Sequence, residues 1–160
     1  MFNQTAEYAL RTVVYLAGLR GAPATTKQLA EATRAPEGYL SKVLQSLSRA
    51  GIVVSQRGPC GGSVLAVAAT ELSVYGVVQA VSPVQRIRSC PLGLKAHAHQ
   101  LCPLHQRMDE ALAVMEKALR DSSIADLLND PSTSRPLDAG SSAAARAAVM
   151  PGVPRGVLSK

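Results

Sequence analysis

Apolar residues recur at helical spacing over the first part of the chain, which predicts a helix from about residue 3 to residue 19. The apolar face of this helix comprises Ala6, Ala9, Leu10, Val13, Val14 and Ala17. Gly21 and Pro23 follow the last apolar position and end the helix.

A capping-box pattern, in which Thr25 precedes Gln28 by three residues, predicts the start of a second helix. This helix is short and ends near Ala32. Residues 33–35 are predicted to form a tight turn into a third helix, which begins at Pro36 because proline loses no hydrogen bond at the first helical position.

The third helix has an apolar stripe on one side and polar residues on the others, and it runs from Pro36 to Arg49, before Gly51. Its stripe comprises Leu40, Val43, Leu44 and Leu47. Two short helices joined by a tight turn, the second polar on its outer face, are typical of a helix-turn-helix.

Two short β-like runs, 52–55 and 64–67, flank the glycine-rich turn Arg57-Gly58-Pro59-Cys60-Gly61-Gly62-Ser63. Its glycines permit a tight reversal and a close approach of the backbone to phosphate. We therefore predict a mainly α fold with a small β-hairpin wing, a winged helix-turn-helix. A nucleotide-binding loop is the weaker interpretation, because no helix follows and no Gly-Lys-Ser/Thr ending is present.

The remaining pattern predicts a short helix that starts near Ser73 and ends at Ser82, and a long amphipathic helix that begins at Pro103. The narrow stripe of the long helix comprises Leu104, Met108, Ala111, Leu112, Met115 and Leu119. Such a stripe favours pairing with a partner helix, and packing within the chain is the alternative. Ser123 and Asp126 are expected to cap a last short turn.

The composition allows a folded core but restricts what builds it. Hydrophobic residues make up 47% of the 160 residues and aromatic residues only 3%, so the core must consist of Leu, Val, Ile and Ala. No apolar run approaches the roughly 20 residues that span a bilayer. The N-terminus lacks the pattern of a signal peptide, so we expect a soluble cytoplasmic protein without a membrane partner.

Positive charge is concentrated in the first part of the chain. Residues 1–66 carry seven Lys/Arg against three Asp/Glu, a balance of +4, whereas residues 90–130 carry four against six, a balance of −2. The first part is therefore suited to a polyanion, and a mildly basic solvated surface is the alternative.

A helix fits the major groove, where polar side chains reach base edges and phosphates. We expect Ser41, Lys42 and Gln45 to face that groove. Gly38 and Tyr39 are expected near the DNA backbone, Arg57 in the minor groove, and Thr26, Gly58 and Gly61 among the other contacts.

Two cysteines and all three histidines of the chain lie within residues 90–105. They are Cys90, His97, His99, Cys102 and His105. Thiolate and imidazole are ligands of zinc and of iron–sulfur centres, and the residues alone do not choose between them. Two alternatives stay open: a thiol-redox switch, and a packed loop that holds no cofactor.

Three motifs together resemble the Rrf-two family of winged-helix transcription regulators (IscR/NsrR-like). They are Glu7-Tyr8-Ala9-Leu10-Arg11, Pro36-Glu37-Gly38-Tyr39-Leu40, and Arg57-Gly58-Pro59 followed by Gly61-Gly62. The resemblance covers about residues 3–128. It implies a homodimer with crossed long helices that reads a palindromic site in double-stranded DNA.

The resemblance also implies an iron–sulfur cluster on three cysteines in many members. Cys90 and Cys102 match the first and last of these, the middle one is missing, and His97 or His99 lies nearest its place. Glu7 matches a carboxylate that some members contribute from the other subunit. A second departure is Cys60, an uncharged thiol on the expected DNA face.

We expect four parts: a winged helix-turn-helix DNA-binding domain (1–82), a Cys/His loop (83–102), a dimerisation helix with a terminal turn (103–129) and a disordered tail (131–160). The expected function is a dimeric repressor whose operator affinity is set at the loop. A metal- or thiol-dependent enzyme, or an adaptor that binds no DNA, is the other class. No catalytic set converges outside the loop, which argues against an enzyme.

Overall fold

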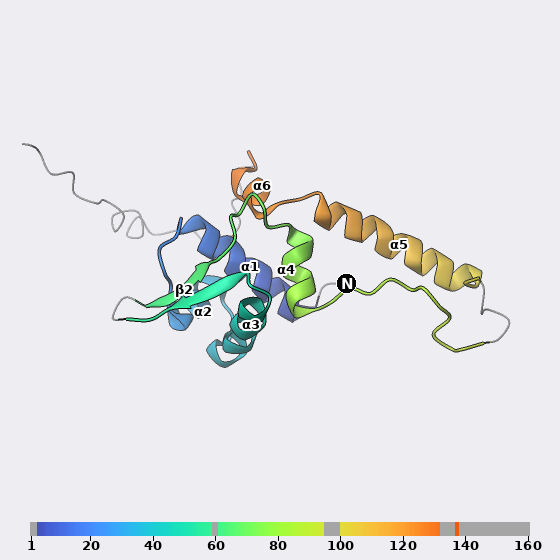
Figure 1. Cartoon of the computed structure of the whole chain (residues 1–160), viewed down its shortest axis with the longest axis horizontal. Coiled ribbons are helices and arrows are strands. Elements are labelled where there is room, and N and C mark those ends of the chain that lie inside the picture. Colours follow the sequence, from blue (N-terminus) through green and yellow to red (C-terminus); the bar gives the residue numbers. More distant parts are fainter. Residues whose placement is uncertain (1–2, 59–60, 95–99, 132–136, 138–160) are drawn as a thin grey trace, which may run out of the picture.

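The structure is a computed structural model that describes residues 3–58, 61–94, 100–131 and 137. Its elements in chain order are α1 (Gln4–Gly18), α2 (Thr26–Thr33), α3 (Glu37–Arg49), β1 (Val53–Gln56), β2 (Gly62–Leu65), α4 (Val74–Val81), α5 (Pro103–Arg120) and α6 (Ile124–Asn129). Figure 1 shows α1 to α4, α6 and the hairpin gathered in one body, from which α5 extends away. The mainly helical fold with one antiparallel hairpin is the predicted one.

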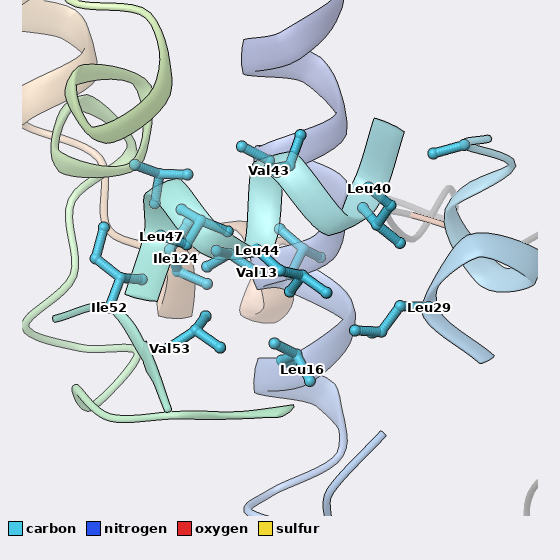
Figure 2. Close-up of a cluster of buried hydrophobic side chains, with 14 of the residues drawn as sticks. Val13, Leu16, Leu29, Leu40, Val43, Leu44, Leu47, Ile52, Val53 and Ile124 are labelled. Atoms are coloured by element: carbon cyan, nitrogen blue, oxygen red, sulfur yellow. The ribbon is translucent and has the colours of Figure 1, made fainter. Parts of the chain in front are cut away.

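The core lies where α3 and α4 pack on α1, and the buried residues of its hydrophobic cluster are all Ala, Val, Leu or Ile, as the composition required. Figure 2 shows α3 contributing Leu40, Val43, Leu44 and Leu47, which face Val13 and Leu16 of α1. Ile124 of α6 is fully buried in the same cluster. Aliphatic burial of this kind stabilises a fold by roughly 1.5–3 kcal/mol per fully buried large side chain.

Helix starts agree closely with the sequence signals. The predicted capping box is present at Thr25, whose hydroxyl accepts from the Gln28 N–H while the Gln28 side chain accepts from the Thr25 N–H. A second capping box joins Ser123 and Asp126 at the start of α6. Pro36 is a correction: it is the N-cap of α3 with extended backbone, and the helix begins one residue later.

The hairpin strands were predicted wrongly by one or two residues. β1 begins at Val53 rather than at Ile52, and β2 begins at Gly62 rather than at Val64. The reason is a second partner for β2: Ser63 exchanges two backbone hydrogen bonds with Ala24, of 2.8 and 3.1 Å. The glycine-rich segment is thereby extended into the ladder two residues before its apolar run begins.

α5 contains no buried residue, although its C-terminal end is tied to the body. The Arg120 guanidinium lies 3.8 Å from the ring centre of Tyr75 on α4. Backbone hydrogen bonds of 2.9 Å from Val74 to Ser122 and from Ile124 to Leu72 then anchor the start of α6.

Most of the predicted tail, 131–160, lies outside the described residues. Leu137 is an exception to the expected disorder, because it is half-buried and packs against the core. Among the helices of the described residues, none is long and apolar enough to cross a membrane.

Candidate nucleic-acid interface and cysteine loop

The polar face of α3 is turned outward because its apolar face is held in the core. Leu40, Val43, Leu44 and Leu47 are buried, whereas Ser41, Lys42 and Gln45 are exposed. The turn before α3 closes tightly because Arg34 adopts a left-handed conformation with φ of 55°. The predicted helix-turn-helix therefore presents the three expected major-groove residues on one accessible surface.

A shallow groove runs between α3 and the hairpin, and we call it the α3 groove. It is lined by Thr26, Ser41, Leu44, Gln45, Ser48, Arg49, Val53, Ser55 and Ser63. Three predicted DNA contacts, Thr26, Ser41 and Gln45, thus come from two helices to one surface. Lys42 is exposed on the neighbouring face of α3.

Sequence reasoning missed Ser48, Arg49 and Ser55 in this groove. The helical repeat carried a signal for the first two, since residues three and four positions beyond Gln45 continue its face. No comparable signal existed for Ser55, because its place depends on the hairpin register in which Ser55 pairs with Ser63.

The wing is a tight hairpin that leaves Arg57 exposed directly after β1. Gly58 has φ of +122°, a conformation that other residues rarely adopt. A side chain at Gly61 would place its Cβ 2.5 Å from the Gln56 carbonyl oxygen. Both predicted wing glycines are thus required by the turn itself, while Pro59 and Cys60 lie outside the described residues.

Tyr39 joins the first turn of α3 to α1. Its hydroxyl is hydrogen-bonded to the Thr5 hydroxyl, and its ring meets Tyr8 edge-on with centres 5.7 Å apart. The side chain is nevertheless 38% exposed, so it remains accessible at the start of α3. Gly38 is exposed and has no atom within 4 Å of the place a Cβ would take.

Cys102 and His105, two of the candidate metal ligands, lie side by side at the start of α5. Cys102 is the N-cap of α5, and its Sγ lies 3.4 Å from His105 Nδ1, which follows three residues later in the first turn of the helix. A tetrahedral zinc ion with bonds of about 2.3 Å to sulfur and 2.0–2.1 Å to nitrogen separates such atoms by about 3.5 Å. The pair therefore fits two positions of a metal centre.

The other predicted ligands do not complete a site within the described residues, where no three Cys, His, Asp or Glu side chains come together. Cys90 is half-buried on the segment before α5. Glu7 lies on α1 in an ion pair with Arg11, which also donates to the Thr33 carbonyl at 3.2 Å. His97 and His99 lie outside the described residues.

Asp109 of α5 holds the segment that leads to Cys90. Its carboxylate accepts hydrogen bonds from Arg86 Nε at 2.7 Å, from Arg86 Nη2 at 2.5 Å and from the Ile87 N–H at 2.8 Å. The Arg86 hydrogen bonds above all, with the Ile87 N–H, hold the pKa of Asp109 below its ordinary value. The pKa of Arg86 is raised by the same contact, so both groups stay charged at neutral pH.

Comparison with known proteins defines the class of protein to which this helix-turn-helix, wing and cysteine loop belong. Residues 2–130 match the Rrf2 family, which is described as iron-dependent transcriptional regulators. The chain belongs to the Rrf2 family and is a DNA-binding transcriptional regulator, which confirms the resemblance drawn from its motifs.

A relative from Aquifex aeolicus, named as an HTH-type transcriptional regulator, is 26% identical over 132 residues, which cover 81% of this chain and 92% of that protein. Among solved structures, T. potens IscR is similar with a TM-score of 0.67 and 22% identity, covering 82% of this chain and 88% of that chain. CymR, the global cysteine regulator of B. subtilis, has a TM-score of 0.65 and 21% identity, over 79% of this chain and 95% of its own. At these identities the structures support the winged-helix fold.

Proposed function

We propose that this regulator binds a palindromic operator as a homodimer and represses transcription. The observation that carries the proposal is the α3 groove, where Thr26, Ser41 and Gln45 meet beside an accessible wing. A two-fold dimer presents two such surfaces, and a palindrome mirrors that symmetry. Repression is the proposed sense because it requires only that the bound protein occupies DNA that transcription needs.

The residues of this surface divide into two roles. Ser41 and Gln45 carry short polar groups suited to base edges, and they specify sequence. Lys42 contacts phosphate and supplies affinity with little sequence preference. Arg57 enters the minor groove, where its binding depends on the width of that groove. Gly38 and Tyr39 lie against the DNA backbone, where Gly38 leaves room for close approach.

We further propose that the loop of residues 90–105 sets operator affinity through a bound [2Fe–2S] or other iron–sulfur cluster, with zinc as the alternative metal. The Cys102–His105 pair at 3.4 Å supports this assignment. Cys90 supplies a third ligand, and His97, His99 or Glu7 of a second copy is available for a fourth. A bound cluster would supply redox sensitivity, and the residues of the chain would hold and orient it.

The proposed coupling runs through α5, which is capped by Cys102 at its start and ends against α4 of the DNA-binding domain. Loss of the ligand shifts the two wings relative to each other and changes the spacing presented to the two half-sites. Coupling free energies of about 1–3 kcal/mol are typical and change affinity roughly 5- to 150-fold.

Replacing Lys42 tests the DNA-binding surface. Lys42→Ala should weaken binding to a cognate operator and reduce the slope of log affinity against log salt by about 1, because one phosphate contact is lost. Lys117→Ala is the matched control, since Lys117 is an exposed lysine of α5 that pairs with Asp121. Equal effects of the two substitutions would reject the assignment of this face.

Replacing both loop cysteines tests the sensor. Anaerobically purified protein should contain iron and absorb visible light, and Cys90→Ala/Cys102→Ala should abolish both properties together with the response of operator affinity to cluster loss. Zinc in a colourless protein would indicate the alternative metal. A metal-free protein whose affinity responds to oxidant only while the cysteines are present would indicate a thiol switch, and unchanged regulation in the double variant would exclude a sensor.

A further inference from the structure

The contact between Arg86 and Asp109 differs from the other ion pairs of the described residues. Four ion pairs of the described residues join positions three or four apart, whereas Arg86 and Asp109 are separated by 23 positions. Asp109 also accepts a hydrogen bond of 2.8 Å from the backbone N–H of Ile87. The carboxylate is only 20% exposed and Arg86 is 32% exposed. The contact therefore fixes the path of a chain segment as well as pairing two charges.

This contact sets how far Cys90 can travel along α5. Figure 1 shows the segment after α4 running beside α5 toward the start of that helix. Three residues from Ile87 to Cys90 span at most about 10–11 Å when extended. Seven residues from Asp109 back to Cys102 rise about 10.5 Å in a helix. The two arms have matching lengths, so Cys90 can reach the level of Cys102.

A second anchor of the segment lies farther from Cys90. Gln79 of α4 donates from Nε2 to the Val84 carbonyl oxygen at 2.9 Å. Cys90 is six residues beyond Val84 and three residues beyond Ile87. Of these two anchors, the one left without Asp109 is therefore six residues from Cys90 instead of three.

We infer that Arg86 and Asp109 are positioning residues of the cysteine loop, which hold Cys90 level with Cys102 so that the two thiols serve one site. This inference rests on the proposed role of the loop, but it concerns the thiols themselves and holds with or without a bound group. A single ion pair that stays in contact with solvent contributes little to global stability. The effect of this contact is therefore on the effective concentration of one thiol near the other.

Thiol cross-linking of the metal-free protein tests the inference. Dibromobimane bridges two nearby thiols and becomes fluorescent once both have reacted, and Cys60→Ser in every protein restricts the signal to Cys90 and Cys102. The Asp109 contact fixes Cys90 at one place along α5, and without this contact Cys90 samples other places, so the effective concentration of one thiol near the other falls. We expect Asp109→Ala to slow bridging, relative to single alkylation, by roughly twofold or more. Alanine is the best helix former, so α5 is retained.

Two comparisons separate positioning from general disruption. Glu110→Ala removes the neighbouring carboxylate, which pairs with Arg107 at 3.1 Å on the same helix, and it should bridge at the rate of the unsubstituted protein. Arg86→Gln should slow bridging, and Arg86→Gln/Asp109→Ala should be no slower than Asp109→Ala, because both changes remove one contact. Equal bridging rates in Asp109→Ala and Glu110→Ala would overturn the inference.

The outcome is independent of the regulatory proposal. Slower bridging in Asp109→Ala would support the positioning role even if Cys90→Ala/Cys102→Ala left regulation of DNA binding unchanged. Unaltered bridging together with a lost response in the double cysteine variant would leave the sensor in place and remove the role of Asp109.

Discussion

At the scale of single residues, Gly62 lies where the wing passes closest to the segment before α2. A Cβ at this position would be 2.6 Å from both the carbonyl carbon and the carbonyl oxygen of Ala24. The two strands are held there by the hydrogen bonds between Ala24 and Ser63, so neither backbone is free to move aside.

Gly62→Ala should therefore destabilise the protein by about 1–3 kcal/mol, the cost typical of overpacking at a closed contact. Urea unfolding followed by circular dichroism measures the difference. Gly18→Ala is the matched control, because Gly18 is in α1 and has no atom within 4 Å of the place a Cβ would take. It should be neutral or stabilising by up to about 1 kcal/mol, and equal losses in both variants would contradict this account.

Features that depend on residues close together in the sequence were predicted best. The capping boxes at Thr25 and Ser123 were predicted because both partners lie within three residues of each other. The contact of Gly62 with Ala24 was not predictable, because no local pattern joins a glycine-rich turn to a segment before a distant helix. The same limit applies to Ser55, whose place in the α3 groove depends on strand register.

At the scale of elements, α5 shows that an apolar stripe predicts a helix more surely than it predicts what the helix packs against. The C-terminal part of the stripe packs inside the chain: Leu112 and Met115 line a small cavity with Ala6 and Val78, and Leu119 packs against the core. The N-terminal part stays exposed. The C-terminal turns of the stripe therefore pack within the chain, and the N-terminal turns are left available for the proposed partner helix.

The contact that the Asp109 carboxylate of α5 makes with the segment before Cys90 should weaken at acidic pH. Because the pKa of Asp109 is lower in the folded protein than its ordinary value of 3.8, the unfolded chain binds more protons in acid. The contribution of this contact to stability is fully present above pH 3.8 and is lost as the pH falls through the lower folded value.

Two-dimensional NMR of the Ile87 amide measures that loss, since its N–H donates to the titrating carboxylate. The amide shift should change with a midpoint below pH 3.8, and Asp109→Asn should remove this titration. A midpoint at or above 3.8 in the unsubstituted protein would show that Arg86 does not stabilise the carboxylate as the structure indicates.

At the scale of the whole molecule, α5 extends from the body with an unburied apolar face (Figure 1). Leu104 is 65% exposed and Met108 is 48% exposed, and Ala111 continues their face one turn later. Apolar residues in such a row on a projecting helix are typical of a surface that pairs with another helix. The same row in a second copy is self-complementary under two-fold symmetry.

Met108→Glu tests the proposed dimer, because it places a charge on the exposed row without touching the core. Burial of one methionine contributes about 1.5–3 kcal/mol, and two-fold symmetry counts the loss twice, so the dimer should dissociate at least about 100-fold more readily. Sedimentation velocity over a concentration series measures the change. Gln106→Glu is the control, since it adds the same charge on the opposite face of α5. If Met108→Glu leaves dimerisation intact, the exposed row of α5 serves another partner. If the variant is monomeric and also binds the operator more weakly, the two α3 grooves of the dimer bind one palindromic site together.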